Sequence, residues 1–314
     1  MQRTSRTFTT LALITSLLTI GLIVFGAVVR VSDSGLGCGD HWPLCDGRII
    51  PPLDNLTAWI EWGHRLFAVL IGVLGLLMLV VAWRTQRGKR FVFPIVVIAA
   101  ILYLLQSMLG AIVVKLELPP TPVSLHLVTA MLLLAALLAS FVAAVYHPRQ
   151  KRQVDNASLL IYITTALSLV IILTGALVRG SGATLACVDW PLCNGDLLPV
   201  NQGQAALIHM MHRFAVVGLG ISLLLTVWQV IQSERGGRTR TVALSAMALY
   251  LLQAGVGAMF VLSVAAPVWG AAHVGLAAGT WALLVVLCVM EYFDTAEIDE
   301  TEPQWKPQSN TAPN

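Results

Sequence analysis

The stretch "GAVVRVSDSGLGCGDHWPLCDG" at residues 26–47 returns as "GALVRGSGATLACVDWPLCNG" at residues 175–195. A second stretch, "YLLQSMLGAIVV" at 103–114, returns as "YLLQAGVGAMFV" at 250–261. The offset between the copies is nearly constant along the chain. Self-similarity at a steady offset is the sequence signature of an internal duplication. We therefore expect two copies of one structural unit.

The composition indicates an integral membrane protein. Hydrophobic residues make up 57% of the 314 residues and charged residues only 11%, whereas soluble domains contain about 25% charged residues. A membrane-spanning helix needs about 20 apolar residues. Apolar segments of this length lie at about 8–30, 58–83, 91–115, 121–146, 158–179, 205–231, 241–264 and 267–293. None of them shows the period-2 alternation of a β-strand, so we expect helices rather than a barrel.

The duplication divides these eight segments into two sets of four. An even number of spans gives both copies the same direction across the membrane, so the repeat is parallel. We expect an all-α fold of two tandem four-helix bundles side by side. The first unit should cover residues 1–148 and the second 149–293, followed by a disordered acidic tail at 294–314.

Basic residues predict the orientation of the chain. They gather in the N-terminus and in the connections at 84–90, 149–152 and 234–240, which all fall on one side of the membrane. Because lysine and arginine are enriched in cytoplasmic loops, both termini should be cytoplasmic in a bacterial plasma membrane, with the two "WPLC" loops outside. The net charge of +3 says nothing about nucleic acid, because the basic residues fall in short loops rather than on one face, and we expect no nucleic-acid partner.

Four of the seven histidines occupy equivalent positions in the two copies. His64 and His126 lie between one and two turns inside their helices from the outer end, and His212 and His273 repeat this arrangement. Ionisable groups in hydrocarbon are costly and usually functional, although a single histidine can serve only as an interhelical hydrogen-bonding group. Each bundle offers two imidazoles at one depth without evident further ligands. This pattern favours a haem with two axial histidines over a mononuclear zinc or iron site.

A carboxylate distinguishes the two histidine pairs. Glu61 lies one turn before His64 on the same helical face, whereas His209 occupies the equivalent position in the second copy. We expect the first half to be the reactive site and the second to hold an electron-transfer haem. Glu61 would exchange protons or stabilise positive charge on a substrate. The alternative is a helix-end glutamate in contact with water.

Other polar residues are also matched by the duplication. They are Arg30 with Arg179, Arg65 with Arg213, and Gln106 with Gln253. The arginines are candidate partners for anionic haem propionates, and anchoring at the membrane interface is the alternative. For the two glutamines we expect hydrogen bonds between helices.

The four loop cysteines should face the oxidising side, where disulfides persist. Pairing within each loop, Cys38 with Cys45 and Cys187 with Cys193, is sterically easy, and pairing across the loops remains open. Such bonds would act as structural braces or as redox-active pairs that exchange electrons with a partner. Cys288, in the last helix, is expected to be a small apolar residue of the packing.

The chain resembles the haem A synthase family over about residues 8–293. The resemblance rests on the "GxGCGxxWPLC" loop, on "EWGHR", on the single histidine of the fourth segment and on the duplicated "WPLC…HR" pattern. It implies an eight-helix fold of two similar bundles. It also implies oxidation of the C8 methyl group of haem O to a formyl group, which gives haem A for terminal oxidases. Two successive hydroxylations would form a gem-diol that loses water.

The resemblance also assigns roles to individual residues. It implies that His212 and His273 are the axial ligands of a haem b cofactor. His64 and His126 belong to the half that converts haem O, and Glu61 is the essential carboxylate. The first-loop cysteine pair is linked by the same resemblance to haem transfer or electron delivery.

No nucleotide-binding fingerprint is present, so electrons are expected from a membrane donor, such as a quinol, or from a partner protein. The haem O synthase is a further expected partner, and the sequence leaves homo-oligomer formation open. Two rival functions remain at this point. One is a di-haem, cytochrome b-like electron carrier, and the other is a quinone-linked membrane thiol oxidoreductase.

Overall fold

The computed structural model describes residues 5–148, 151–233 and 235–296. Within these residues all regular structure is helical, and each of the long helices is long and apolar enough to cross a membrane. The helices are α1 (Arg6–Val31), α2 (Leu56–Thr85), α3 (Val92–Lys115), α4 (Pro120–Val145), α5 (Asn156–Gly180), the short 3₁₀ helix η1 (Ala183–Leu185), α6 (Gln204–Gln232), α7 (Gly237–Leu262) and α8 (Pro267–Thr295).

Each predicted apolar segment coincides with one of the long helices within a few residues at either end. The largest difference is at α7, which begins at Gly237 rather than at 241 because the polar residues before the apolar run are already helical. Helix α8 continues through Thr295, so the first residues of the predicted tail are also helical. The rest of that tail, 297–314, lies outside the described residues.

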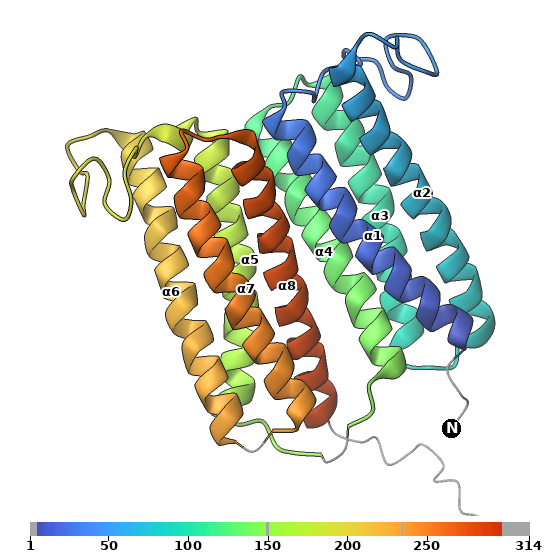
Figure 1. Cartoon of the computed structure of the whole chain (residues 1–314). Helices are drawn as coiled ribbons and strands as arrows, with labels where there is room; N and C mark the ends of the chain where they lie inside the picture. Colours follow the sequence, from blue (N-terminus) through green and yellow to red (C-terminus); the bar gives the residue numbers. More distant parts are fainter. Residues whose placement is uncertain (1–4, 149–150, 234, 297–314) are drawn as a thin grey trace, which may run out of the picture.

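The two halves of the chain form two four-helix bundles that lie side by side (Figure 1). Helices α1–α4 make one bundle and α5–α8 the other. The long α1–α2 and α5–α6 connections, which carry the cysteines, emerge at the same end of the molecule, opposite the N-terminus. The two copies therefore run in the same direction, as a parallel repeat requires.

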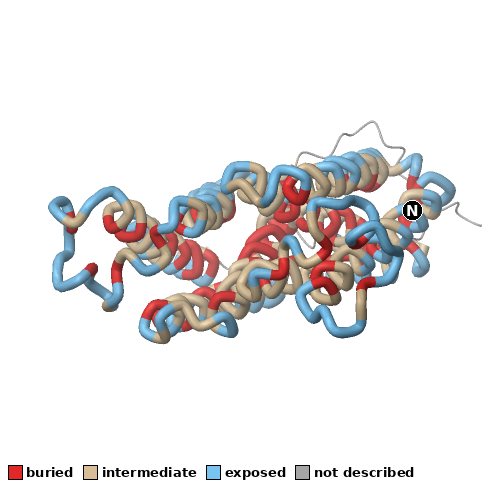
Figure 2. Tube along the Cα trace, turned by 90° about the horizontal axis from the view of Figure 1, so that it is seen from above, coloured by how far each residue is buried: buried red, intermediate tan, exposed pale blue. Residues whose placement is uncertain are grey.

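The bundles meet through their inner helices. Helices α1 and α4 of the first bundle contact α5 and α8 of the second. Their shared core contains Ile23, Met131, Leu134, Trp281 and Val285, and the indole N–H of Trp281 donates to the carbonyl of Met131 at 2.9 Å. Seen from above, buried residues face inward while exposed residues follow the loops and the outer helix faces (Figure 2). Those outer faces are apolar, as contact with lipid requires.

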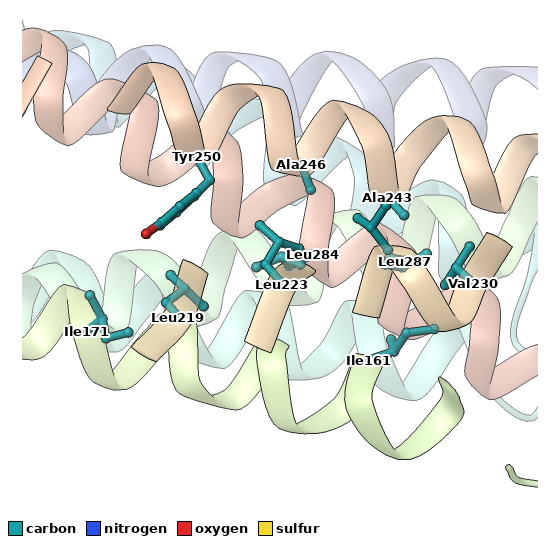
Figure 3. Close-up of a cluster of buried hydrophobic side chains, with 11 residues drawn as sticks. Ile161, Ile171, Leu219, Leu223, Val230, Ala243, Ala246, Tyr250, Leu284 and Leu287 are labelled. Atoms are coloured by element: carbon teal, nitrogen blue, oxygen red, sulfur yellow. The ribbon is translucent and has the colours of Figure 1, made fainter. Parts of the chain in front are cut away.

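The core of each bundle is closed by a matched tyrosine. In the second bundle Tyr250 joins a cluster of buried aliphatic side chains from α5, α6, α7 and α8 (Figure 3). Its hydroxyl donates to the carbonyl of Val216 at 2.7 Å. Tyr103 makes the equivalent bond to the carbonyl of Ala68 at 3.0 Å. A buried phenol needs such a partner, and here the bond ties α7 to α6 and α3 to α2.

A buried ion network ties together the ends of three helices, at the end opposite the cysteine loops. Arg235, in the α6–α7 connection, has a fully buried side chain that donates to Glu291 of α8 at 2.6 Å and to Asp155 at 2.7 Å. Asp155 is the N-cap of α5, where it accepts from the amide of Ser158. The hydrogen bond from Arg235 holds the pKa of Asp155 well below its usual range.

Loss of Arg235 should therefore destabilise the second bundle. The variant Arg235→Ala leaves the buried Glu291 carboxylate without its cation, and breaking a buried pair in this way costs about 3–5 kcal/mol. We expect a clearly lower melting temperature in detergent. Arg238→Ala, an exposed arginine three residues later, is the matched control and should change stability by less than about 0.5 kcal/mol. Equal melting temperatures for the two variants would contradict this account of the network.

Candidate functional site

The structure brings the predicted histidines together as two pairs. His64 of α2 and His126 of α4 lie close enough for their charges to interact, and so do His212 of α6 and His273 of α8. All four side chains are partly buried. Each bundle therefore presents two imidazoles from different helices on the side of the molecule that carries the cysteine loops.

Hydrogen bonds orient both histidines of the second bundle. Nδ1 of His212 lies 2.8 Å from the hydroxyl of Thr174, which also lies 2.8 Å from the carbonyl of Ile171. Nδ1 of His273 lies 3.3 Å from the backbone carbonyl of Gln253, which can only accept, so this Nδ1 carries the hydrogen and Nε2 of His273 keeps a free lone pair. Both rings of the second bundle are thus held at Nδ1, and Nε2 is left for another partner. This is the arrangement that second-sphere partners impose on metal-binding histidines.

The first bundle lacks this arrangement. Nε2 of His126 is 3.2 Å from Nε2 of Gln106, and its Nδ1 is buried without a partner. The ring of His64 packs against Phe25 with centroids 5.9 Å apart, and no described residue is hydrogen bonded to its ring. Phe25 and Thr174 are equivalent residues of the duplication, so an apolar contact in one copy replaces a hydrogen bond in the other. The first pair is consequently less constrained than the second.

Glu61 is buried, with 3% of its surface exposed, near the N-terminal end of α2, next to the first cysteine loop. One carboxylate oxygen accepts from the backbone N–H of Cys38 at 2.8 Å, and the other is paired with Arg65 one turn later. A carboxylate has about four acceptor sites, so both oxygens can still accept another hydrogen bond. In the second copy the same position holds His209, which is also buried and interacts with the backbone of Ala183.

Two matched arginines hold the cysteine loops in place. Arg65 donates to the carbonyls of His41 at 3.0 Å and Leu44 at 3.1 Å. Arg213 donates in the same way to Pro191 at 3.2 Å and to the carbonyl of the next residue. The two guanidinium groups thus tie the "WPLC" turns to α2 and α6. Pairing of these arginines with haem propionates remains a prediction.

The other matched arginines approach each other where the bundles meet. Arg30 ends α1 and Arg179 ends α5, and their charges are close enough to interact. The Nε atom of Arg30 is buried without a partner in the structure. Two neighbouring cations of this kind would suit an anionic group, so the predicted role of Arg30 and Arg179 as propionate partners is retained as a prediction.

The loop cysteines form disulfides within each loop. Cys38 is bonded to Cys45 and Cys187 to Cys193, so the alternative of pairing across the loops is wrong. All four residues are at most 1% exposed. A buried disulfide offers no sulfur for direct attack by a thiol of another protein, and this burial favours the bracing role over thiol exchange. Cys288 is free, as expected.

The donor set in the described part of the chain fits a porphyrin better than a bare metal ion. It contains no group of three or more histidine, cysteine or acidic side chains that could hold a metal. A mononuclear zinc or iron site would need such a group. A porphyrin brings four nitrogens of its own, so two imidazoles complete the coordination of its iron. His212 and His273, which are held at Nδ1 by other partners, meet that need.

Phe25 and Thr174, the residues next to the histidine rings, were not predicted from the sequence. Both stand directly before the repeated "GA" pair, where the otherwise similar phrases read "FGAVVR" and "TGALVR". The available signal was that one copy has an apolar residue and the other a hydroxyl residue at the same position of two otherwise similar phrases. The loop contacts of Arg65 and Arg213 were also missed, because only the folded loop brings its carbonyls to the helix.

Comparisons with known proteins agree on one family. Residues 9–285 match the COX15-CtaA family of cytochrome oxidase assembly proteins. The heme A synthase of Symbiobacterium thermophilum is 33% identical over 283 residues, which cover 85% of this chain and 90% of that protein. The heme A synthase of Shouchella clausii is 33% identical over 259 residues, 81% of this chain and 86% of that protein. That of an Exiguobacterium species is 29% identical over 297 residues, 92% and 96% of the respective chains.

The two arginine braces generate a prediction about loop dynamics. Arg65→Ala removes the loop contacts and also leaves the buried Glu61 carboxylate with one partner, whereas Arg213→Ala removes loop contacts alone. We expect faster amide hydrogen exchange in the loop of each variant, with the larger increase at 38–48 in Arg65→Ala. Exchange can be followed by mass spectrometry of the two loop peptides. Unchanged exchange in both variants would show that the arginines do not brace the loops.

Proposed function

We propose that this chain, which belongs to the COX15-CtaA family of cytochrome oxidase assembly proteins, oxidises the C8 methyl group of haem O to the formyl group of haem A. Its family membership makes it a haem A synthase, a multi-pass membrane enzyme of haem A biosynthesis. The proposal adds the reaction and the residues. Two hydroxylations each replace a C–H bond of the methyl carbon by C–OH. With dioxygen as the oxidant, each consumes one O₂, two electrons from the donor and two protons, and releases one water. The resulting gem-diol then loses one water to give the formyl group.

The proposal rests on one observation, which is that the two histidine pairs differ in the hydrogen bonds made by their imidazole rings. His212 and His273 are held by hydrogen bonds at Nδ1, which suits permanent ligands of a resident haem b. His64 and His126 lack such bonds, and Nε2 of His126 contacts the amide of Gln106 instead. Imidazole rings that are not held in one orientation suit a substrate haem that must bind and then leave. We therefore place haem O in the first bundle and haem b in the second.

Haem b, when bound, would supply electron transfer to the reacting haem O. The second bundle contributes the orientation of the rings. Thr174 and the carbonyl of Gln253 hold the two imidazole rings at Nδ1. The buried Cys187–Cys193 disulfide packs against Ala206 and Met210 of α6, the helix that carries His212.

Glu61 is the catalytic carboxylate in this proposal. It lies one turn above His64 and is held in one orientation by the amide of Cys38 and the guanidinium of Arg65. Its unused lone pairs can accept a proton from the hydroxylated carbon, or stabilise positive charge that develops there. The second copy has the neutral or cationic ring of His209 in the same place, which suits a half without substrate chemistry.

An apolar groove beside His64 suits the long isoprenoid tail of haem O. Its walls include Phe25, Phe67, Leu70 and Val73, and it lies between α1 and α2 on the outer surface of the bundle. Phe25 also packs on the His64 ring, so the groove adjoins the proposed substrate site. Burial of an isoprenoid chain stabilises a complex by about 0.8 kcal/mol per CH₂ group.

The proposed orientation places the cysteine loops outside and both termini in the cytoplasm. The α2–α3, α4–α5 and α6–α7 connections lie at the end opposite the disulfide loops (Figure 1). These connections and the adjoining helix ends carry Arg84, Arg87, Lys151, Arg152 and Arg238, as the enrichment of basic residues on the cytoplasmic side requires. Electrons would come from a membrane donor, such as a quinol, or from a partner protein. The haem O synthase is the proposed source of the substrate.

The reaction is tested by extracting pigment from cells that make haem O together with this protein. The wild type should yield formyl haem, whereas a di-haem carrier would yield none. In Glu61→Gln we expect at least about 100-fold less formyl haem, because general acid–base groups contribute roughly 10²–10⁴-fold to rates. Glu117→Gln, an exposed carboxylate in the α3–α4 turn, is the control and should match the wild type. Wild-type formyl haem in Glu61→Gln would remove Glu61 from the mechanism.

The assignment of haem b is tested at Thr174. Thr174→Val keeps the shape of the side chain but removes the oxygen that fixes Nδ1 of His212. Loss of such a second-sphere partner typically lowers metal affinity about 10–100-fold, so the low-spin haem signal per protein should fall on dilution or washing. Thr174→Ser keeps the hydroxyl and should retain the signal. Equal haem retention in the two variants would argue against this role of Thr174.

A further inference from the structure

Every odd-numbered helix carries a Gly-Ala pair, and every following even-numbered helix carries one of the four paired histidines. The pairs occur in the sequences "GAVV" (26–29), "GAIV" (110–113), "GALV" (175–178) and "GAMF" (257–260). The large duplication therefore contains a smaller unit. This unit is a two-helix hairpin with Gly-Ala in its first helix and a histidine in its second, and it occurs in α1–α2, α3–α4, α5–α6 and α7–α8.

In the first bundle each glycine faces the imidazole of its own hairpin. A methyl group added at Gly26 would lie 3.2 Å from Nε2 of His64. One added at Gly110 would lie 3.2 Å from Cε1 of His126. Atoms in van der Waals contact normally lie about 3.5–4.0 Å apart, so each ring would have to shift by a few tenths of an ångström beside an alanine.

The second bundle repeats the same contact, more tightly at one of its two glycines. A methyl group added at Gly175 would lie 3.2 Å from Cε1 of His212. At Gly257 it would lie only 2.9 Å from Cε1 of His273 and 3.2 Å from Nδ1. The contact therefore occurs in all four hairpins, although the loops that join the helices differ greatly in length.

The contact is selective among the helical glycines. An added methyl group at Gly75, Gly218 or Gly255 would meet nothing within 4 Å. Gly255 is in α7, two residues before Gly257, so neighbouring glycines of one helix have opposite surroundings. General tolerance of glycine in membrane helices does not explain this difference. The four glycines of the Gly-Ala pairs share one property, which is that an imidazole lies against them.

The glycine meets the ring edge that matters for ligation. Cε1 is bonded to both ring nitrogens, so a methyl group that pushes on Cε1 or Nε2 tilts the Nε2 lone pair. We infer that Gly26, Gly110, Gly175 and Gly257 are positioning residues that set the direction of the four paired imidazoles. The contact itself is independent of any ligand. Its importance for haem rests on the function proposed above.

The inference is tested by comparing Gly257→Ala with Gly255→Ala in the purified membrane protein. Alanine is the better helix former, so helix propensity favours both variants equally. We expect Gly257→Ala to retain about tenfold less low-spin haem per protein, the lower limit for disturbed ligand orientation, and to show a new high-spin band. Gly255→Ala should match the wild type. Gly175→Ala, with its longer contact, should show an intermediate loss, and it replaces Gly257→Ala if that variant does not fold.

A double-mutant cycle separates this inference from the proposed function. If the clash is with the imidazole, Gly257→Ala lowers the melting temperature relative to Gly255→Ala, and the difference disappears in a His273→Ala background. An equal cost of Gly257→Ala in both backgrounds would overturn the inference, and so would equal haem retention in Gly257→Ala and Gly255→Ala. A wild-type protein that binds no haem would contradict the proposed function. The double-mutant cycle would still decide whether Gly257 acts on His273.

Discussion

The structure depends on the cost of placing imidazole rings inside hydrocarbon. A polar ring in the membrane needs a hydrogen-bond partner, a metal or a second polar group. Here each of the four rings comes from the second helix of a hairpin and lies against the first helix of the same hairpin. Side-by-side packing of hairpins then brings two rings together in each bundle. The four-helix bundles are the smallest assemblies that accomplish this pairing.

Duplication of one scaffold has allowed the two halves to diverge at a few positions. Phe25 opposite Thr174 and Glu61 opposite His209 change the surroundings of the rings without changing the helices. The braces do not change, because Arg65 and Arg213 hold similar loops with similar disulfides. The half with the carboxylate also has the loosely held imidazoles. Chemistry and ligand exchange would therefore be concentrated in one bundle.

Much of the fold could be predicted from the sequence, because hydropathy and repeat offsets are local signals. The eight spans, the parallel repeat and the pairing of His212 with His273 were all predicted, and each appears in the structure. The interhelical bonds of the matched glutamines are also confirmed, since Gln106 contacts His126 and Gln253 accepts from Thr280.

Contacts that depend on the rotation of a helix about its axis could not be predicted in this way. The sequence placed Arg235 only in a basic connection, whereas the fold buries it between two carboxylates. Likewise nothing in the spacing indicated that Glu61 would accept from the amide of Cys38, because that bond requires the loop to fold back over α2. The chemical surroundings of the candidate site thus emerged only from the packing.

The most direct test of the account is the absorption spectrum of two purified single variants. His212→Ala should lose the low-spin haem signal, because its bundle then offers one imidazole to the iron. His64→Ala should keep the haem b signal of the second bundle and lose only formyl haem production in cells. A low-spin spectrum of wild-type intensity in His212→Ala would show that iron porphyrin is not held between these helices.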